Sequence, residues 1–145
     1  MTGGGRLAIG FAAAAVVAAA TAAVVMETPA AFVLALPVAA LHVALIGAPV
    51  YLLLRRKLAP SALSILAGGF LTGAIPLFLF LAFASAGYGG RGTNVWSNGV
   101  QTIADGALTA AGWLELVAAA GYFGGCGLAG GLAFWLITRT PRAAE

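Results

Sequence analysis

The sequence predicts an all-α integral membrane protein, a four-helix transmembrane bundle made of two antiparallel hairpins. Of its 145 residues, 62% are hydrophobic and only 8% are charged, whereas soluble domains use charged residues at about 25% of their positions. Four apolar segments are long enough to cross a bilayer, which takes about 20 residues. Polar turns separate these segments. We therefore expect a single transmembrane domain over residues 1–145.

The first expected helix covers about residues 7–26, an alanine- and valine-rich run that follows Arg6. Its length matches the hydrocarbon thickness of a bilayer. A cleaved secretory signal peptide is the alternative interpretation of this segment, because a basic start, an apolar stretch and Ala18-Ala19-Ala20 are all present. The orientation of the later helices is the same in either case.

The second expected helix covers about residues 30–54 and runs back beside the first after a very short turn. Pro29 suits the first turn of this helix, where a backbone N–H has no partner in any case. Pro37 and Pro49 lie further inside, and each removes one backbone hydrogen bond and can kink the helix. Bilayer helices tolerate such prolines when neighbouring groups satisfy the freed carbonyls.

The densest charge of the chain follows, in Arg55, Arg56 and Lys57. A basic cluster beside a long apolar segment marks the cytoplasmic side of a membrane, so these three side chains are expected to act as a cytoplasmic anchor. The third expected helix covers about residues 60–86. It contains Gly69 and Gly73 at a four-residue spacing, which lets a neighbouring helix backbone approach closely.

Hydrophobicity falls between residues 87 and 106, where turn-forming residues predict an outer loop. Its glycine-rich run at 89–92 lacks the lysine and the serine or threonine of a phosphate-binding loop. The fourth helix is expected over about residues 107–138, which is too long for a bilayer at 1.5 Å per residue, so its first turns should project outward. Gly127 and Gly131 share one face of it and predict a second close helix contact.

The distribution of basic residues predicts the orientation. Six cations fall on one side of the four expected helices and only Arg91 falls on the other, so the positive-inside rule places both termini in the cytoplasm. The six are Arg6, Arg55, Arg56, Lys57, Arg139 and Arg142. We expect a multi-pass protein of the inner, cytoplasmic membrane.

His42, Thr72 and Cys126 are expected to share one polar layer inside the membrane. His42 lies 13 residues before Arg55, or about 20 Å along a helix, which is too deep to reach water. Pro76 has no N–H for the carbonyl of Thr72, so we hypothesise that His42 donates a hydrogen bond to that carbonyl. A metal needs three or four ligands and this layer supplies two, so neither a metal nor a cofactor is predicted. A structural histidine is the favoured interpretation, and a proton-conducting one is the alternative.

Glu115 is the acid that lies closest to the apolar core of the fourth helix. It precedes Arg139 by 24 residues, or about 36 Å along a helix, which exceeds the roughly 30 Å of bilayer hydrocarbon. This spacing predicts an acid at the outer interface, beside Trp113. The alternative interpretation is a carboxylate at the entrance of a conduction path.

The residues indicate a function without chemistry on a substrate. The chain has one histidine with no acid at its depth and no Gly-x-Ser-x-Gly turn, so we predict that it is not an enzyme. We predict a non-enzymatic accessory or assembly subunit that packs its glycine-rich helix faces against other membrane proteins or copies of itself. The alternative is a small oligomeric pore or transporter with a path past His42. No basic face interleaved with aromatics is present, so no nucleic-acid partner is expected.

Overall fold

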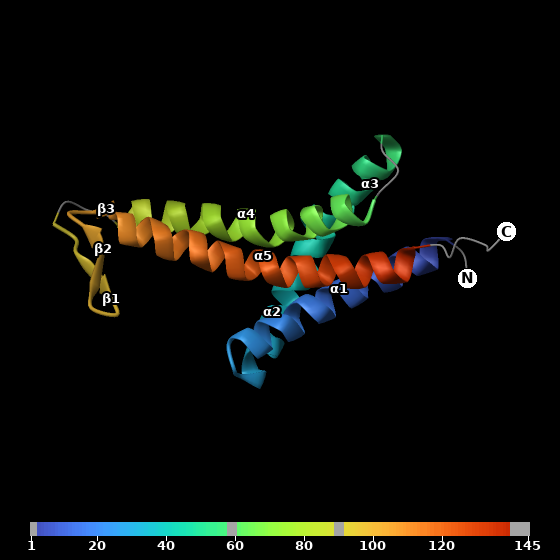
Figure 1. Ribbon diagram of the computed structural model, residues 1–145, viewed down its shortest axis with the longest axis horizontal. Helices are drawn as coiled ribbons and strands as arrows, with labels where there is room; N and C mark the ends of the chain where they lie inside the picture. The colour runs from blue at the N-terminus through green and yellow to red at the C-terminus, as the bar shows by residue number, and fades with distance from the viewer. Residues whose placement is uncertain (1–2, 58–60, 89–91, 140–145) are drawn as a thin grey trace.

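The computed structural model describes residues 3–57, 61–88 and 92–139. These residues are mostly helical, and they contain four helices that are long and apolar enough to cross a membrane. The helical elements are α1 (Gly3–Val25), α2 (Pro29–His42), the π-helical turn η1 (Val43–Gly47), α3 (Ala48–Lys57), α4 (Ala62–Tyr88) and α5 (Ala110–Thr138). Figure 1 shows α4 and α5 side by side, with α1 along the other side of α5.

A tight reversal joins α1 to α2. Glu27 adopts a left-handed backbone conformation with φ of 52°, and the N–H of Thr28 donates to the carbonyl of Ala23 at 3.1 Å. This is the Schellman arrangement, which satisfies carbonyls that the end of a helix leaves without donors. Pro29 then begins α2 in the position where its missing N–H costs nothing. The chain therefore turns back within a few residues, and α2 packs against α1.

The second apolar span is a helix in three parts rather than one regular helix. Within η1 the turn is wider than in an α-helix, and the N–H of Ala48 donates to the carbonyl of Val43, five residues earlier. Pro49 explains the position of this turn, because its ring clashes with the carbonyl four residues before it and it has no N–H to donate. Pro37 lies inside α2 without interrupting it.

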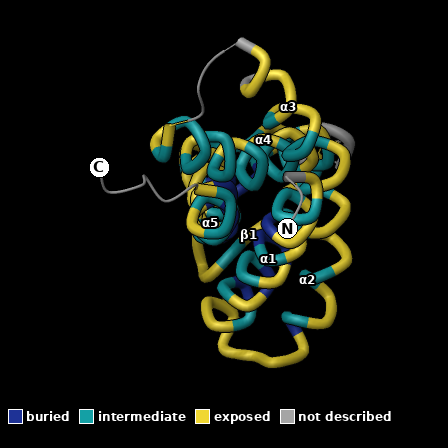
Figure 2. The backbone as a smooth tube through the Cα atoms, turned by 90° about the vertical axis from the view of Figure 1, so that its right-hand side faces the viewer, coloured by how far each residue is buried: buried dark blue, intermediate teal, exposed yellow. Residues whose placement is uncertain are grey.

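The core of the protein lies along α5, which packs against both α1 and α4. The buried apolar side chains of α1 are alanines, which lets the backbones of α1 and α5 lie close together. Figure 2 shows that buried positions are sparse on α2, which is mostly exposed or half-buried. The buried apolar residues of α1 and α5 are Ala14, Ala15, Ala19, Ala22, Leu116, Ala120, Cys126 and Phe134.

The end of α5 is tied to the start of α1. The Arg6 guanidinium donates hydrogen bonds to the carbonyls of Ile137, at 3.2 Å, and Arg139, at 3.0 Å. A cation at a helix C-terminus also interacts favourably with the helix dipole. The guanidinium of Arg139 in turn lies 5.1 Å from the centroid of the Trp135 ring. The start of α1 and the end of α5 consequently lie together (Figure 1).

A small antiparallel sheet replaces part of the expected outer loop, so the all-α prediction was incomplete. Strands β1 (Val95–Ser97), β2 (Val100–Ala104) and β3 (Ala107–Leu108) are ordered β1-β2-β3. Both connections are two-residue turns with positive φ, at Asn98-Gly99 with 49° and 79° and at Asp105-Gly106 with 47° and 79°. Asn-Gly and Asp-Gly favour such hairpin turns because these residues adopt left-handed conformations at low cost.

The sheet is fixed onto the first turn of α5. The Thr109 hydroxyl accepts a hydrogen bond from the N–H of Gly112 at 3.2 Å and donates one to the carbonyl of Gln101 at 2.7 Å. Gly112 has no side chain where the carbonyl of Thr102 approaches it. Thr109 therefore caps the helix, which begins at Ala110 rather than at the expected residue 107. The sheet lies at the end of the molecule opposite the start of α1 and the end of α5 (Figure 1).

Candidate functional site

The helices border a cavity of about 970 Å³ that is partly open to the surface of the bundle. His42 of α2, Thr72 of α4 and Cys126 of α5 all line it. The three side chains of the predicted polar layer thus contribute to one cavity wall. The remainder of the wall is mostly alanine, glycine, aliphatic and aromatic, and no Asp, Glu, Lys or Arg is part of it among the described residues.

The cavity exists because the second span leans away from the rest of the bundle. The α2 helix packs against α1, but the contact of this span with α4 is made through η1 and α3. A space therefore remains between α2 and the α4–α5 pair. On α2, Val33 does not line this space and is 70% exposed, as is usual for a side chain that meets lipid tails.

His42 bonds to its own helix and not to Thr72. Its Nδ1 lies 2.8 Å from the carbonyl oxygen of Val38, one turn earlier. A carbonyl oxygen can only accept, so Nδ1 carries the proton, and a neutral imidazole has no second N–H to offer. The hypothesised donation from His42 to the Thr72 carbonyl was therefore wrong. Counting residues along a helix places His42 at the height of Thr72, but it does not determine which group the His42 ring bonds to.

The hydroxyl groups near this layer also bond within their own helices. The Thr72 hydroxyl donates to the carbonyl of Gly68 at 2.7 Å, and the Thr21 hydroxyl donates to the carbonyl of Val17 at 2.9 Å. Such bonds leave neither hydroxyl activated as a nucleophile, which would need an adjacent base. In the described ranges, no three His, Cys, Asp or Glu side chains form a group that could hold a metal ion.

The four glycines expected to mediate helix packing lie where α4 meets α5. A Cβ atom on Gly69 would overlap the carbonyl oxygen of Gly127, and a Cβ on Gly127 would overlap the carbonyl oxygen of Gly69. A Cβ on Gly73 would meet the carbonyl of Phe123 in the same way, and one on Gly131 would lie 3.1 Å from the carbonyl oxygen of Ile65. The backbones are in direct contact here, which gives the pair a large van der Waals surface.

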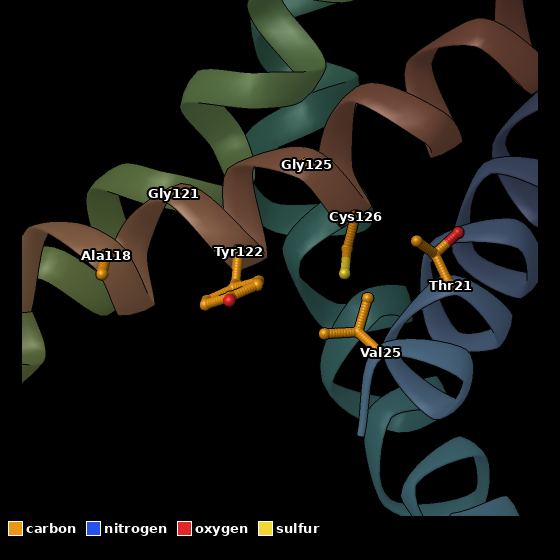
Figure 3. A pocket seen from close by; sticks show the side chains of 7 residues that line it. All are labelled: Thr21, Val25, Ala118, Gly121, Tyr122, Gly125 and Cys126. Carbon is orange, nitrogen blue, oxygen red and sulfur yellow. The ribbon is translucent and has the colours of Figure 1, made fainter. Parts of the chain in front are cut away.

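Another part of α5 carries glycines that contact nothing. Gly121 and Gly125 have no atom within 4 Å of the position where a Cβ would be. They line a shallow pocket of about 480 Å³ that also includes Ala118, Tyr122 and Cys126 of α5 and Thr21 and Val25 of α1. Figure 3 shows the α1 and α5 side chains on the two sides of this pocket. We call the surface formed by Ala118, Gly121, Tyr122 and Gly125 the open face of α5.

The predicted charged positions lie on the surface. Glu115 is exposed near the start of α5, two residues after the half-exposed Trp113. Arg55 and Arg56 are exposed at the end of α3, and the side chain of Lys57 lies outside the described residues. Glu115, Arg55 and Arg56 do not line the cavity.

An aromatic cluster in the cavity wall was not predicted from the sequence. The rings of Phe11 and Tyr51 have centroids 5.9 Å apart, and Phe134 lies 4.7 Å from Phe11 and 4.9 Å from Tyr51. The three rings come from α1, α3 and α5 and line the cavity beyond η1. The three residues lie far apart in the sequence within apolar runs, so no local pattern in the sequence indicates that they meet.

Comparisons of the chain with protein-family models, with curated proteins and with solved structures find no match. Its function is therefore inferred from its own geometry, in which the cavity around His42 and the open face of α5 are the two distinctive features.

Proposed function

We propose that the protein is a non-enzymatic accessory or assembly subunit of the inner membrane that holds a partner transmembrane helix against the open face of α5. The observation that carries this proposal is the contrast between the glycines of α5. Gly124, Gly127, Gly130 and Gly131 each lie against another helix, whereas Gly121 and Gly125 contact nothing. A glycine inside a helix lowers helix stability by about 1 kcal/mol relative to alanine. Close helix packing offsets this cost for the four glycines that lie against another helix, but not for Gly121 and Gly125.

The open face has the form that a second helix needs. Ala118, Gly121, Tyr122 and Gly125 follow one another at spacings of three or four residues and therefore lie on one side of α5. Gly121 and Gly125 have the spacing at which two helix backbones approach closely in lipid. Tyr122 is 63% exposed beside them and offers a hydroxyl to a partner. The partner is a helix of another membrane protein or of a second copy.

The proposed orientation places both termini in the cytoplasm. Three features support it: the Arg6 guanidinium is bound to the end of α5, Arg55 and Arg56 end α3, and the outer sheet lies at the opposite end of the molecule. Arginine-rich ends face the cytoplasm by the positive-inside rule. The same orientation places Glu115 and the sheet on the outer side.

The substitution Gly125→Leu tests this function. After mild-detergent purification from the native host, the wild-type chain should carry a partner or form a dimer, and Gly125→Leu should lose it while its own thermal unfolding stays unchanged. Ala67→Leu is the matched control, because Ala67 is an exposed small residue on α4. Purification of the wild type as a monomer without partners would contradict the proposal, as would equal loss of the partner in Ala67→Leu.

A small oligomeric pore or transporter is the second candidate function. The supporting observation is that His42, Thr72 and Cys126 line one cavity. Ion or proton flux into liposomes that His42→Leu abolishes, together with unchanged partner binding in Gly125→Leu, would favour this function over the first.

A further inference from the structure

The cavity around His42 has a feature that neither helix docking nor conduction uses. The span that contains His42 covers Pro29–Leu53, so the histidine lies about 20 Å from one end and about 16 Å from the other at 1.5 Å per residue. Water at either membrane surface is too far away to hydrate the ring. Polar groups at such a depth need a partner inside the protein or in the membrane.

One nitrogen of His42 has no such partner in the described parts of the chain. Nδ1 is held by the carbonyl of Val38 at 2.8 Å and carries the proton. Nε2 of the neutral ring is therefore an acceptor, and no donor from the residues that the structure describes reaches it. His42 lines the cavity, so the edge of the ring that its own helix does not hold is the edge available to an occupant. An acceptor left without a donor in an apolar surrounding costs free energy.

The wall of the cavity defines the rest of the occupant. It is apolar along its length, with Ala39 and Val43 on the side of His42 and Leu77 and Phe80 on α4. Of its hydroxyl groups, those of Thr72 and Ser64 already donate to carbonyls of their own segments. The other two, on Thr28 and Tyr51, come from the two ends of the second span. No described charged side chain lines it, so a phosphate headgroup or an ion would have no counter-charge.

We propose that this cavity binds a lipid alcohol, an elongated apolar molecule whose single hydroxyl group donates a hydrogen bond to Nε2 of His42. A plain hydrocarbon chain fills the same volume but leaves Nε2 without a donor. A charged lipid cannot bring its headgroup to this depth. This inference does not rest on helix docking at the open face of α5, and failure of either leaves the other standing.

The single histidine of the chain allows a direct test. Protein labelled with ¹⁵N-histidine gives one Nδ1 and one Nε2 resonance, and it is titrated in detergent micelles with phytol, a diterpene alcohol, or with the O-methyl ether of phytol. We expect phytol to move the Nε2 resonance toward the hydrogen-bonded position and to leave Nδ1 in place. The ether should not move Nε2. Since one hydrogen bond distinguishes the probes, phytol should bind about tenfold more tightly.

Three variants separate recognition of the hydroxyl from filling of the cavity. A photoreactive phytol analogue, competed with phytol or with the ether, measures the preference in each. His42→Leu should reduce the tenfold preference to about onefold, and His42→Gln, whose amide oxygen accepts a hydrogen bond, should restore most of it. Thr72→Val is the matched control in the same wall and should keep the wild-type preference, because the Thr72 hydroxyl is bound to Gly68.

Other occupants give different results, each of which would overturn the proposal. Equal binding of the alcohol and the ether to the wild type would show that any apolar chain fills the cavity. Absence of binding, with covalent dimers through a cysteine at Ala39 in a Cys126→Ala background, would show that a second copy fills it. A preference that persists in His42→Leu would place the hydroxyl against another group.

Discussion

Replacement of Gly69 by alanine should destabilise the protein, whereas the same replacement at the adjacent Gly68 should not. A Cβ on Gly69 would overlap the carbonyl oxygen of Gly127 and lie 3.2 Å from both the carbonyl carbon of Gly127 and the Cα of Gly131. These are backbone atoms, which cannot rotate away as a side chain can. A Cβ on Gly68 would have no atom within 4 Å.

The two changes share a gain in helix propensity and differ in their steric cost. Alanine favours a helix over glycine by about 1 kcal/mol, and overpacking of a tight contact costs about 1–3 kcal/mol, with more where backbones must separate. Gly69→Ala should therefore lower the free energy of unfolding by about 1–2 kcal/mol. Gly68→Ala should leave it unchanged or raise it by up to about 1 kcal/mol.

Unfolding in mixed micelles, followed by circular dichroism as the mole fraction of dodecyl sulfate rises, measures both variants. The midpoint for Gly69→Ala should fall below that of the wild type and the midpoint for Gly68→Ala should not. Equal midpoints for the two variants would refute the direct backbone contact between α4 and α5. A lower midpoint for both would indicate that glycine is needed at these positions for another reason.

Three further outcomes are expected. Gly99→Ala should weaken the hairpin of β1 and β2, because Gly99 has a φ of 79° that alanine adopts at a cost of about 1 kcal/mol. Faster hydrogen exchange in β1 and β2, with no change in the helices, would show this effect. His42→Leu should change the free energy of unfolding by less than about 1 kcal/mol, since the ring bonds only to its own helix; a large loss in the micelle assay would contradict it. Cysteines at Ala107 and Ser61, in a Cys126→Ala background, should react with an impermeant reagent in intact cells only at Ala107, and reaction only at Ser61 would reverse the proposed orientation.

The four long apolar helices could be predicted from the sequence because length and hydropathy are enough to recognise a candidate span. The arrangement of those helices is different, since lipid and protein interior are equally apolar and the pattern of side chains does not show which face turns inward. Only glycine spacing carried that information, and it did so for Gly69, Gly73, Gly127 and Gly131. The same spacing at Gly121 and Gly125 did not indicate that this pair would lie against no other helix among the described residues.

The outer sheet could have been predicted and was missed. Asn98-Gly99 and Asp105-Gly106 are strong hairpin signals, and Val95, Val100 and Ile103 around them favour strands. The glycine content of the whole segment concealed them. The wide turn before Pro49 and the Val38 partner of His42 depend on backbone geometry within one helix, which the identity of the residues alone does not determine.

The bond between Arg6 and the carbonyl of Ile137 joins residues 131 positions apart, and this separation sets the order of events during biosynthesis. The ribosome completes α1 long before α5, so the alanine surface that α5 later covers is at first without its partner helix. The α4 helix also lacks its main packing partner until α5 has been synthesised, because its main contact is with α5. Folding of this chain is therefore completed only after the last helix has been released, and a chain that stalls before Gly124 would present two unpaired surfaces to the quality-control proteases of the membrane.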